Sequence, residues 1–269
     1  DENDGNAAKA IGTYQKYLAE APKGAYRSGA QARIDALRAN PKDVQKITTQ
    51  AQMAQSKEAQ DAYDAAVKLQ QEQKYDEAIE SYKKAIAVNA NEPAYYYAMG
   101  TAYQANNDLD NAISNYEKAM GLDPATKAYK EALDGAKSAK ASPLLDSAYK
   151  KQTTDLGGGK YDLPGAIADY KAALRIFDDA GTHMNLGTAL QANNNNQEAL
   201  AEYTKAINMD NKLADAYYYR GTIFEAQGNK AAARKDYQRY LQLAPTGPNA
   251  ADVKERMKGL GPATTRKRR

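Results

Sequence analysis

The sequence has no cysteine, no tryptophan and a single histidine among its 269 residues. Without cysteine it can form neither a disulfide nor a Cys/His metal site, and its one histidine provides no recognisable catalytic triad. No apolar run approaches the roughly 20 residues of a membrane-spanning helix. We therefore expect a protein that is not an enzyme, with no catalytic residues, no metal site, no cofactor and no small-molecule substrate.

The charges are nearly balanced, with 37 basic and 34 acidic side chains and a formal net charge of +3. Such a surface lacks the positive excess of a nucleic-acid-binding domain. The one basic cluster is the tail formed by Arg266, Lys267, Arg268 and Arg269. A short basic end is more often disordered and solvated. Association with nucleic acid or an anionic membrane through this tail stays open as an alternative.

Residues 74–86 and 108–120 carry the same arrangement of small residues around one tyrosine, 34 positions apart. Each copy follows a second periodic stretch, in which a glycine often lies between bulky residues, and these spacings are typical of one face of a helix. Five copies make chance an unlikely explanation. The repeated positions are Ala78, Tyr82, Ala85; Ala112, Tyr116, Ala119; Ala166, Tyr170, Ala173; Ala199, Tyr203, Ala206; and Ala233, Tyr237, with glycines at Gly100, Gly187 and Gly221.

These residues resemble the tetratricopeptide repeat (TPR), a 34-residue unit made of one helix (helix A), a turn and a second helix (helix B). The three glycines match the helix-A glycine of the family, and Pro124 and Pro245 match the proline that ends helix B. The resemblance implies an all-α fold, the TPR α-α superhelix, which is a right-handed α-solenoid of helix-turn-helix repeats. Both ends are similar to bacterial members, which implies a bacterial protein of the cell envelope or periplasm, with the cytoplasm left open.

The family's register defines complete repeats at 59–92, 93–126, 145–179, 180–213 and 214–247. Residues 5–24 align without gaps with residues 228–247, so the sequence opens with a helix B that either ends an upstream array or is completed by another molecule. We expect a break or an irregular turn at Ser142–Pro143, and a turn in repeat three that is two residues longer than in the other repeats. The expected segments are 1–38, a half TPR repeat plus a short helix; 39–58, a linker helix; 59–126, repeats one and two; 127–144, an inserted helix and linker; 145–247, repeats three to five; 248–260, a C-terminal capping helix; and 261–269, a basic disordered tail.

Three local motifs are better explained without special chemistry. The glycines of residues 157–160 lack the spacing and the Ser or Thr of a phosphate-binding loop. The acidic runs at 1–5 and 106–110 lack the glycine and glutamate of a calcium loop. His183 holds a helix-A place that tyrosine fills in other repeats, which favours a packing role.

In TPR proteins the concave groove is lined by the second, fifth, sixth, ninth, twelfth and thirteenth places of helix A. The resemblance therefore implies a partner-binding groove lined mainly by phenol rings and hydroxyl groups. Tyrosine suits such a surface because it offers a large, rigid contact with a polar tip. The alternative is that some of these rings only pack between repeats. The groove residues are Tyr63, Val67, Tyr97, Thr101, Tyr149, Thr153, Met184, Asn185, Thr188, Tyr218, Tyr219 and Thr222.

The sixth places, held by Asp64, Ala98, Lys150, Asn185 and Tyr219, argue against the family's clamp for acidic peptide tails, which resembles a set of Lys, Asn and Arg side chains. We therefore predict a scaffold that binds a neutral or weakly polar peptide or protein. The alternative function is a structural subunit that docks onto a larger assembly through its ends, including the N-terminal half repeat, or through its convex face.

Overall fold

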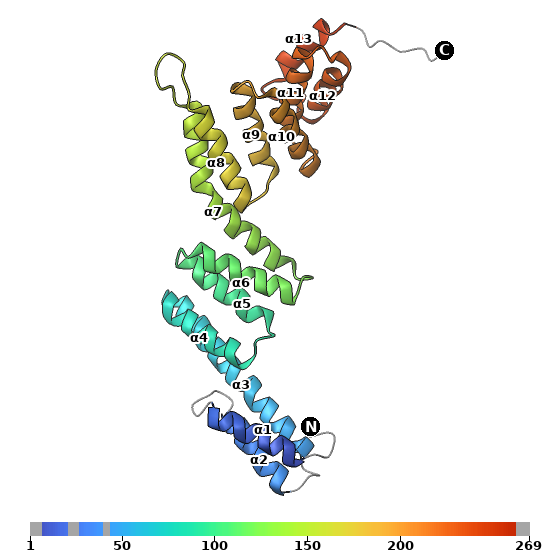
Figure 1. Cartoon of the computed structure of the whole chain (residues 1–269). Helices are drawn as coiled ribbons and strands as arrows, with labels where there is room; N and C mark the ends of the chain where they lie inside the picture. The colour runs from blue at the N-terminus through green and yellow to red at the C-terminus, as the bar shows by residue number, and fades with distance from the viewer. Residues whose placement is uncertain (1–6, 21–26, 40–43, 262–269) are drawn as a thin grey trace, which may run out of the picture. The chain divides into compact units, whose positions relative to one another are not determined.

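The computed structural model describes residues 7–20, 27–39 and 44–261, which leaves the runs 1–5 and 266–269 outside the described residues. Every regular element in these ranges is an α-helix, so the expected all-α repeat fold is confirmed (Figure 1). The helices are α1 (Ala7–Glu20), α2 (Arg27–Ala39), α3 (Val44–Gln71), α4 (Tyr75–Val88), α5 (Pro93–Ala105), α6 (Leu109–Leu122), α7 (Lys127–Thr153), α8 (Leu163–Ile176), α9 (Ala180–Ala192), α10 (Asn196–Met209), α11 (Ala214–Ala226), α12 (Lys230–Leu243) and α13 (Ala250–Gly259).

The chain divides into two compact units, residues 1–136 (unit 1) and 137–269 (unit 2). In unit 1, α3 packs on α4, α4 on α5 and α5 on α6, while α1 and α2 pack together and α2 contacts α3. Unit 2 repeats this order from α8 to α13. Both units are therefore stacks of sequential helices, as the 34-residue period predicts.

A tyrosine of helix B lies against a small residue of helix A in each complete repeat. A Cβ added to Gly100 would lie 2.7 Å from the ring of Tyr116, and one added to Gly187 would lie 2.6 Å from the ring of Tyr203. Only a small side chain at this eighth place lets the two helices approach so closely. The buried rings, each no more than 1% exposed, are Tyr82, Tyr116, Tyr170, Tyr203 and Tyr237, and the small residues of helix A that pack with them are Ala66, Gly100, Ala148, Gly187 and Gly221.

Four of the five turns between helix A and helix B have three residues. The middle residue of each turn has a positive φ, between 60° and 74°, which glycine and asparagine adopt most easily. Gln73 is the exception in residue type, although it has the same conformation. The middle residues are Gln73, Asn107, Asn194 and Gly228.

The fifth turn, between α7 and α8, corrects the expected length. It covers residues 154–162, so it is six residues longer than the others and not two. The carboxylate of Asp155 accepts hydrogen bonds from the backbone N–H groups of Gly157, Gly159 and Lys160 at 2.8–3.1 Å. The glycine run that looked like a phosphate cradle therefore binds a carboxylate of its own loop.

The expected break at Ser142–Pro143 is wrong, because α7 continues through Pro143 as one helix. Proline removes one backbone hydrogen bond and crowds the preceding turn, which costs about 3 kcal/mol. Packing holds the helix on both sides: Leu133 and Ala136 lie in one buried cluster, and Ala148 lies in another. Helix α3 is also continuous, so the segment expected as a linker helix and helix A of repeat one form a single element.

We predict opposite effects for two glycine-to-alanine substitutions in repeat two. Gly100→Ala should lower the free energy of unfolding by about 1–3 kcal/mol, because its methyl group would press on the ring of Tyr116. Gly121→Ala should raise it by roughly 0.5–1 kcal/mol, because no atom lies within 4 Å and alanine favours the helix. Urea unfolding followed by circular dichroism measures both. Equal effects would contradict the close contact.

Candidate functional site

The buried helix-B tyrosines donate hydrogen bonds to a side chain at the twelfth place of helix A. Tyr82 donates to Gln70 Oε1 at 2.8 Å, and Gln70 Nε2 donates to Thr101 Oγ1 of the next repeat at 3.0 Å. The same series joins Tyr170, Gln152 and Thr188, and then Tyr203, Gln191 and Thr222. We call this series the Tyr–Gln–Thr ladder, since it connects repeat one to repeat two, repeat three to repeat four, and repeat four to repeat five.

The ladder changes the role expected of the ninth-place threonines. Each hydroxyl of Thr101, Thr188 and Thr222 accepts from a glutamine and donates to a carbonyl of its own helix at 2.7 Å. These hydroxyls therefore hold adjacent repeats together. Sequence reasoning missed this role. The signal for it is a glutamine or glutamate four positions after the small residue of each helix A, namely Gln70, Gln104, Gln152, Gln191 and Glu225.

The ladder also locates the ends of the repeat stacks. Gln104 accepts from Tyr116, but the position 31 residues later is Gly135, which has no side chain to continue the series. In repeat five Glu225 accepts from Tyr237 at 2.6 Å and from Arg256 of α13 at 3.0 Å. Arg256 thus takes the threonine's place and joins α13 to the last repeat through an ion pair.

The register of repeat three is four residues earlier than the sequence suggested. Gln152 bonds to Tyr170 as the twelfth-place residues of other repeats do, and Ala148 is fully buried at the eighth place. Tyr149 therefore holds the ninth place and Thr153 the thirteenth, while Leu145 holds the fifth. The cause is the longer turn, which the sequence spacing alone did not reveal. Tyr149 remains a candidate contact, since it is 65% exposed.

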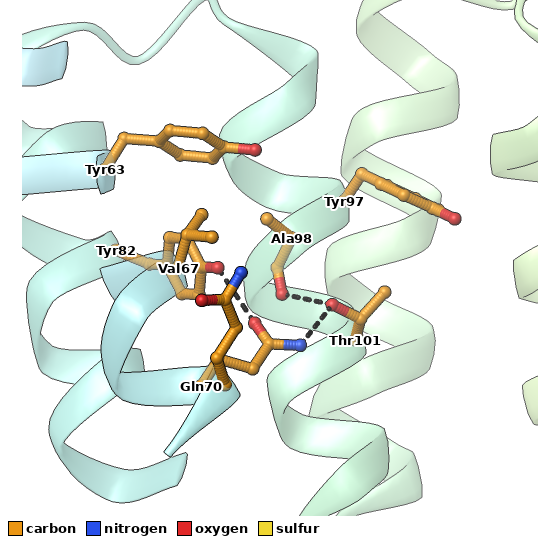
Figure 2. A pocket seen from close by; sticks show the side chains of 8 residues that line it. Tyr63, Val67, Gln70, Tyr82, Tyr97, Ala98 and Thr101 are labelled. Atoms are coloured by element: carbon orange, nitrogen blue, oxygen red, sulfur yellow. Dashed lines mark hydrogen bonds between the residues drawn. The ribbon is translucent and has the colours of Figure 1, made fainter. Parts of the chain in front are cut away.

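Four of the candidate residues lie together around a cavity of about 460 Å³ in unit 1 (Figure 2). Helix α3 contributes its last two turns, α5 contributes its middle, and a helix-B tyrosine of α4 lies between them. Ala98, at the sixth place, leaves room at the side of α5. We name this site the tyrosine cavity; its lining is Tyr63, Val67, Gln70, Gln71, Tyr82, Tyr97, Ala98 and Thr101.

The polar groups of the tyrosine cavity fall into two sets. Gln70, Tyr82 and Thr101 bond to one another within the ladder, as the dashed lines in Figure 2 show. Among the described residues, the phenol oxygens of Tyr63 and Tyr97 and the amide of Gln71 have no hydrogen-bond partner. Both rings are held by neighbours: Tyr63 lies 5.1 Å from Tyr95, and Tyr97 lies 5.2 Å from Tyr129. The cavity therefore combines fixed aromatic walls with open hydrogen-bonding tips.

The candidate residues of unit 2 make contacts with their own neighbours. Tyr219 holds the sixth place there, and its ring stacks on Tyr203 with centroids 5.8 Å apart. The hydroxyl of Tyr218 donates to Asp252 of α13 at 2.9 Å, and Met184 packs against two buried clusters. The side-chain amide of Asn185 has no hydrogen bond to any described residue, so it remains available to a partner.

His183 is buried, 6% exposed, as its repeated place predicts. Its Nδ1 lies 2.5 Å from Glu202 and its Nε2 lies 2.7 Å from Asp178, so the ring links α9 to α10 and to the preceding loop. Among the described residues no group of three or more His, Asp or Glu side chains could hold a metal ion. None of the described helices has the length and apolar character needed to cross a membrane.

Family models match three stretches of the chain. Models described as tetratricopeptide repeat match residues 93–126 and 184–248, and one described as TPR repeat matches residues 68–107. No match is found among curated proteins.

Solved structures of TPR proteins are similar over much of the chain. YrrB, described as a TPR protein with an unusual peptide-binding site, is 18% identical over 72% of this chain and 90% of its own, with a TM-score of 0.33. The TPR2AB domain of yeast Sti1, solved in a complex with pHSP90, is 19% identical over 96% of this chain and 100% of its own, with a TM-score of 0.36. The TPR domain of Arabidopsis OM64 is 22% identical over 46% of this chain and 98% of its own, with a TM-score of 0.40.

We predict that Gln191→Ala destabilises the protein more than Gln104→Ala. Both substitutions remove the acceptor of a buried tyrosine hydroxyl, which costs about 1–3 kcal/mol. Gln191→Ala also removes the donor to Thr222, whereas Gln104 has no threonine to reach. Urea unfolding of the two variants gives the comparison. A double-mutant cycle of Gln191→Ala with Thr222→Val should show coupling, and additive effects would contradict the ladder.

We also predict a loss of stability at alkaline pH. Burial, with a smaller effect of Tyr97, raises the pKa of Tyr116 from 10.0 to about 12. The folded state thus favours the neutral phenol, so stability is complete below the unfolded pKa and falls as the pH rises from about 10 to about 12. Urea unfolding across this range, compared with Tyr116→Phe, measures the effect. An identical pH dependence in the variant would contradict it.

Proposed function

Because the chain is a tetratricopeptide-repeat protein with an all-α helical repeat fold, we propose that it is a non-enzymatic interaction scaffold that binds a peptide or protein partner in the tyrosine cavity. The observation that carries this proposal is the cavity itself, about 460 Å³ in volume and lined by the groove-facing places of two adjacent repeats. This volume lies within the usual range of ligand pockets, roughly 300–1,000 Å³.

The chemistry of the tyrosine cavity suits a peptide segment. Its walls are the rings of Tyr63, Tyr82 and Tyr97 with Val67 and Ala98, which favour burial of apolar side chains. The unpartnered phenols of Tyr63 and Tyr97 and the amide of Gln71 offer hydrogen bonds to a peptide backbone. Rigid tyrosines bind at low entropic cost, because packing already limits their rotation.

In unit 2, Asn185 and the exposed Tyr149 remain candidates for a separate partner contact. Tyr218, Tyr219 and the threonines of the ladder have packing roles as well, so they are weaker candidates. We therefore place the main contact in unit 1.

Peptide-display selection on the full chain tests the proposal. Tyr63→Ala should weaken the affinity for the selected peptides about tenfold or more, since truncating an interface tyrosine commonly costs over 1 kcal/mol of binding free energy. Ala98→Tyr should also abolish binding, because it places a ring at the sixth place, where Tyr219 fills the equivalent space of repeat five. Fluorescence anisotropy measures affinity, and circular dichroism checks that each variant is folded.

Tyr161→Ala is the matched control, because this tyrosine is exposed and lies outside the tyrosine cavity. Its affinity for the peptides should match that of the unchanged protein. Selected peptides that bind folded Tyr63→Ala and Ala98→Tyr as tightly as the unchanged protein would move the binding surface elsewhere and refute the proposal.

A further inference from the structure

Two acidic residues lie close to Tyr63, which lines the tyrosine cavity. Burial raises the pKa of Tyr63, and the negative charges of Asp64 and Glu92 raise it further. The same two carboxylates raise the pKa of the neighbouring Tyr95 after the larger effect of burial. Asp64 follows Tyr63 on α3. Glu92 is the N-cap residue of α5, one turn before Tyr95, whose ring stacks on that of Tyr63 with centroids 5.1 Å apart. The edge of the cavity next to Tyr63 is therefore negative.

These carboxylates are not neutralised within the described part of the chain. Glu92 is half-buried, and its side chain has neither an ion pair nor a hydrogen bond to any described residue. Asp64 accepts only from the neutral amide of Gln60, at 2.8 Å. No lysine or arginine lines the tyrosine cavity. No described cation offsets either charge, so a cation placed there by a ligand would be stabilised.

The aromatic walls suit the same charge. Elsewhere in the protein, tyrosine rings hold cations: Lys118 lies 5.8 Å from the ring of Tyr96, and Arg220 lies 5.8 Å from that of Tyr217. Among the described residues no cation lies over Tyr63 or Tyr97. Figure 2 shows these two rings away from the hydrogen-bonded Gln70 and Thr101. Electron-rich faces next to carboxylates attract a guanidinium or ammonium group.

We propose that the partner presents a basic side chain, arginine or lysine, flanked by apolar residues, with the cation beside Asp64 and Glu92 and the apolar residues in the tyrosine cavity. The proposal rests on the function proposed above and names the chemistry of the partner. It departs from the neutral partner that the sequence suggested. An acidic peptide is excluded by repulsion, because both charges at this edge are negative.

Three synthetic peptide pools test the proposal. They share one set of random apolar and neutral flanking residues and differ only in a central arginine, glutamine or glutamate. Fluorescence anisotropy with the full chain should rank the pools as arginine, then glutamine, then glutamate, with about tenfold between arginine and glutamine. Added salt should weaken the binding of the arginine pool markedly and that of the glutamine pool very little.

Charge-removing variants test the position of the cation. Asp64→Asn combined with Glu92→Gln should lower the affinity for the arginine pool about tenfold, while leaving the affinity for the glutamine pool nearly unchanged. Glu255→Gln is the control, because Glu255 is an exposed acid of α13 and lies far along the sequence from the cavity. It should change the affinity for neither pool. Circular dichroism confirms that each variant is folded.

The outcomes separate the two proposals. If the glutamine pool binds as tightly as the arginine pool and Tyr63→Ala abolishes both, the partner is neutral; the inference of a basic partner is then wrong and the cavity stands as the site. Arginine-pool binding that is unaffected by Asp64→Asn with Glu92→Gln would likewise overturn the inference. If no pool binds, or if folded Tyr63→Ala binds all pools normally, both proposals fail.

Discussion

The contact between a helix-B tyrosine and a small residue of helix A is the constraint on which each repeat depends. The ring occupies the space that a side chain at the eighth place would need, as Gly187 and Tyr203 show. Once the ring lies there, its hydroxyl reaches the twelfth-place side chain, and that side chain reaches the next repeat. One steric requirement inside a repeat thus sets the polar contact between repeats.

Much of this fold could be predicted from sequence because its determinants are local and repeated. The spacing of Ala112, Tyr116 and Ala119 is enough to indicate helix pairs. Two features could not be predicted this way. The continuity of α7 through Pro143 depends on packing at both of its ends, and the register of Tyr149 depends on a loop whose extra length has no periodicity to reveal it.

The candidate site was predictable in its places but not in its shape. The family's groove positions identify Tyr63, Tyr97 and Thr101, yet nothing in their pattern shows that a cavity forms beside them. That outcome depends on the sixth place: Ala98 leaves space in unit 1, whereas Tyr219 stacks on Tyr203 in unit 2. A small side chain at the sixth place accompanies the cavity in repeat two, whereas a large one at the same place makes a ring contact in repeat five.

The ends of the Tyr–Gln–Thr ladder bear on how such a protein can lengthen. Consider a copy of repeat four inserted before repeat five. The threonine of the copy would accept a hydrogen bond from Gln191, and its glutamine would donate one to Thr222, so both ladder hydrogen bonds of the copy would form. The same copy inserted between repeat two and α7 would receive a donor from Gln104, but its own glutamine would meet Gly135, which has no side chain. Gene duplication should therefore be tolerated within unit 2 and resisted at the start of α7, which makes the polar pairing a rule for evolutionary growth.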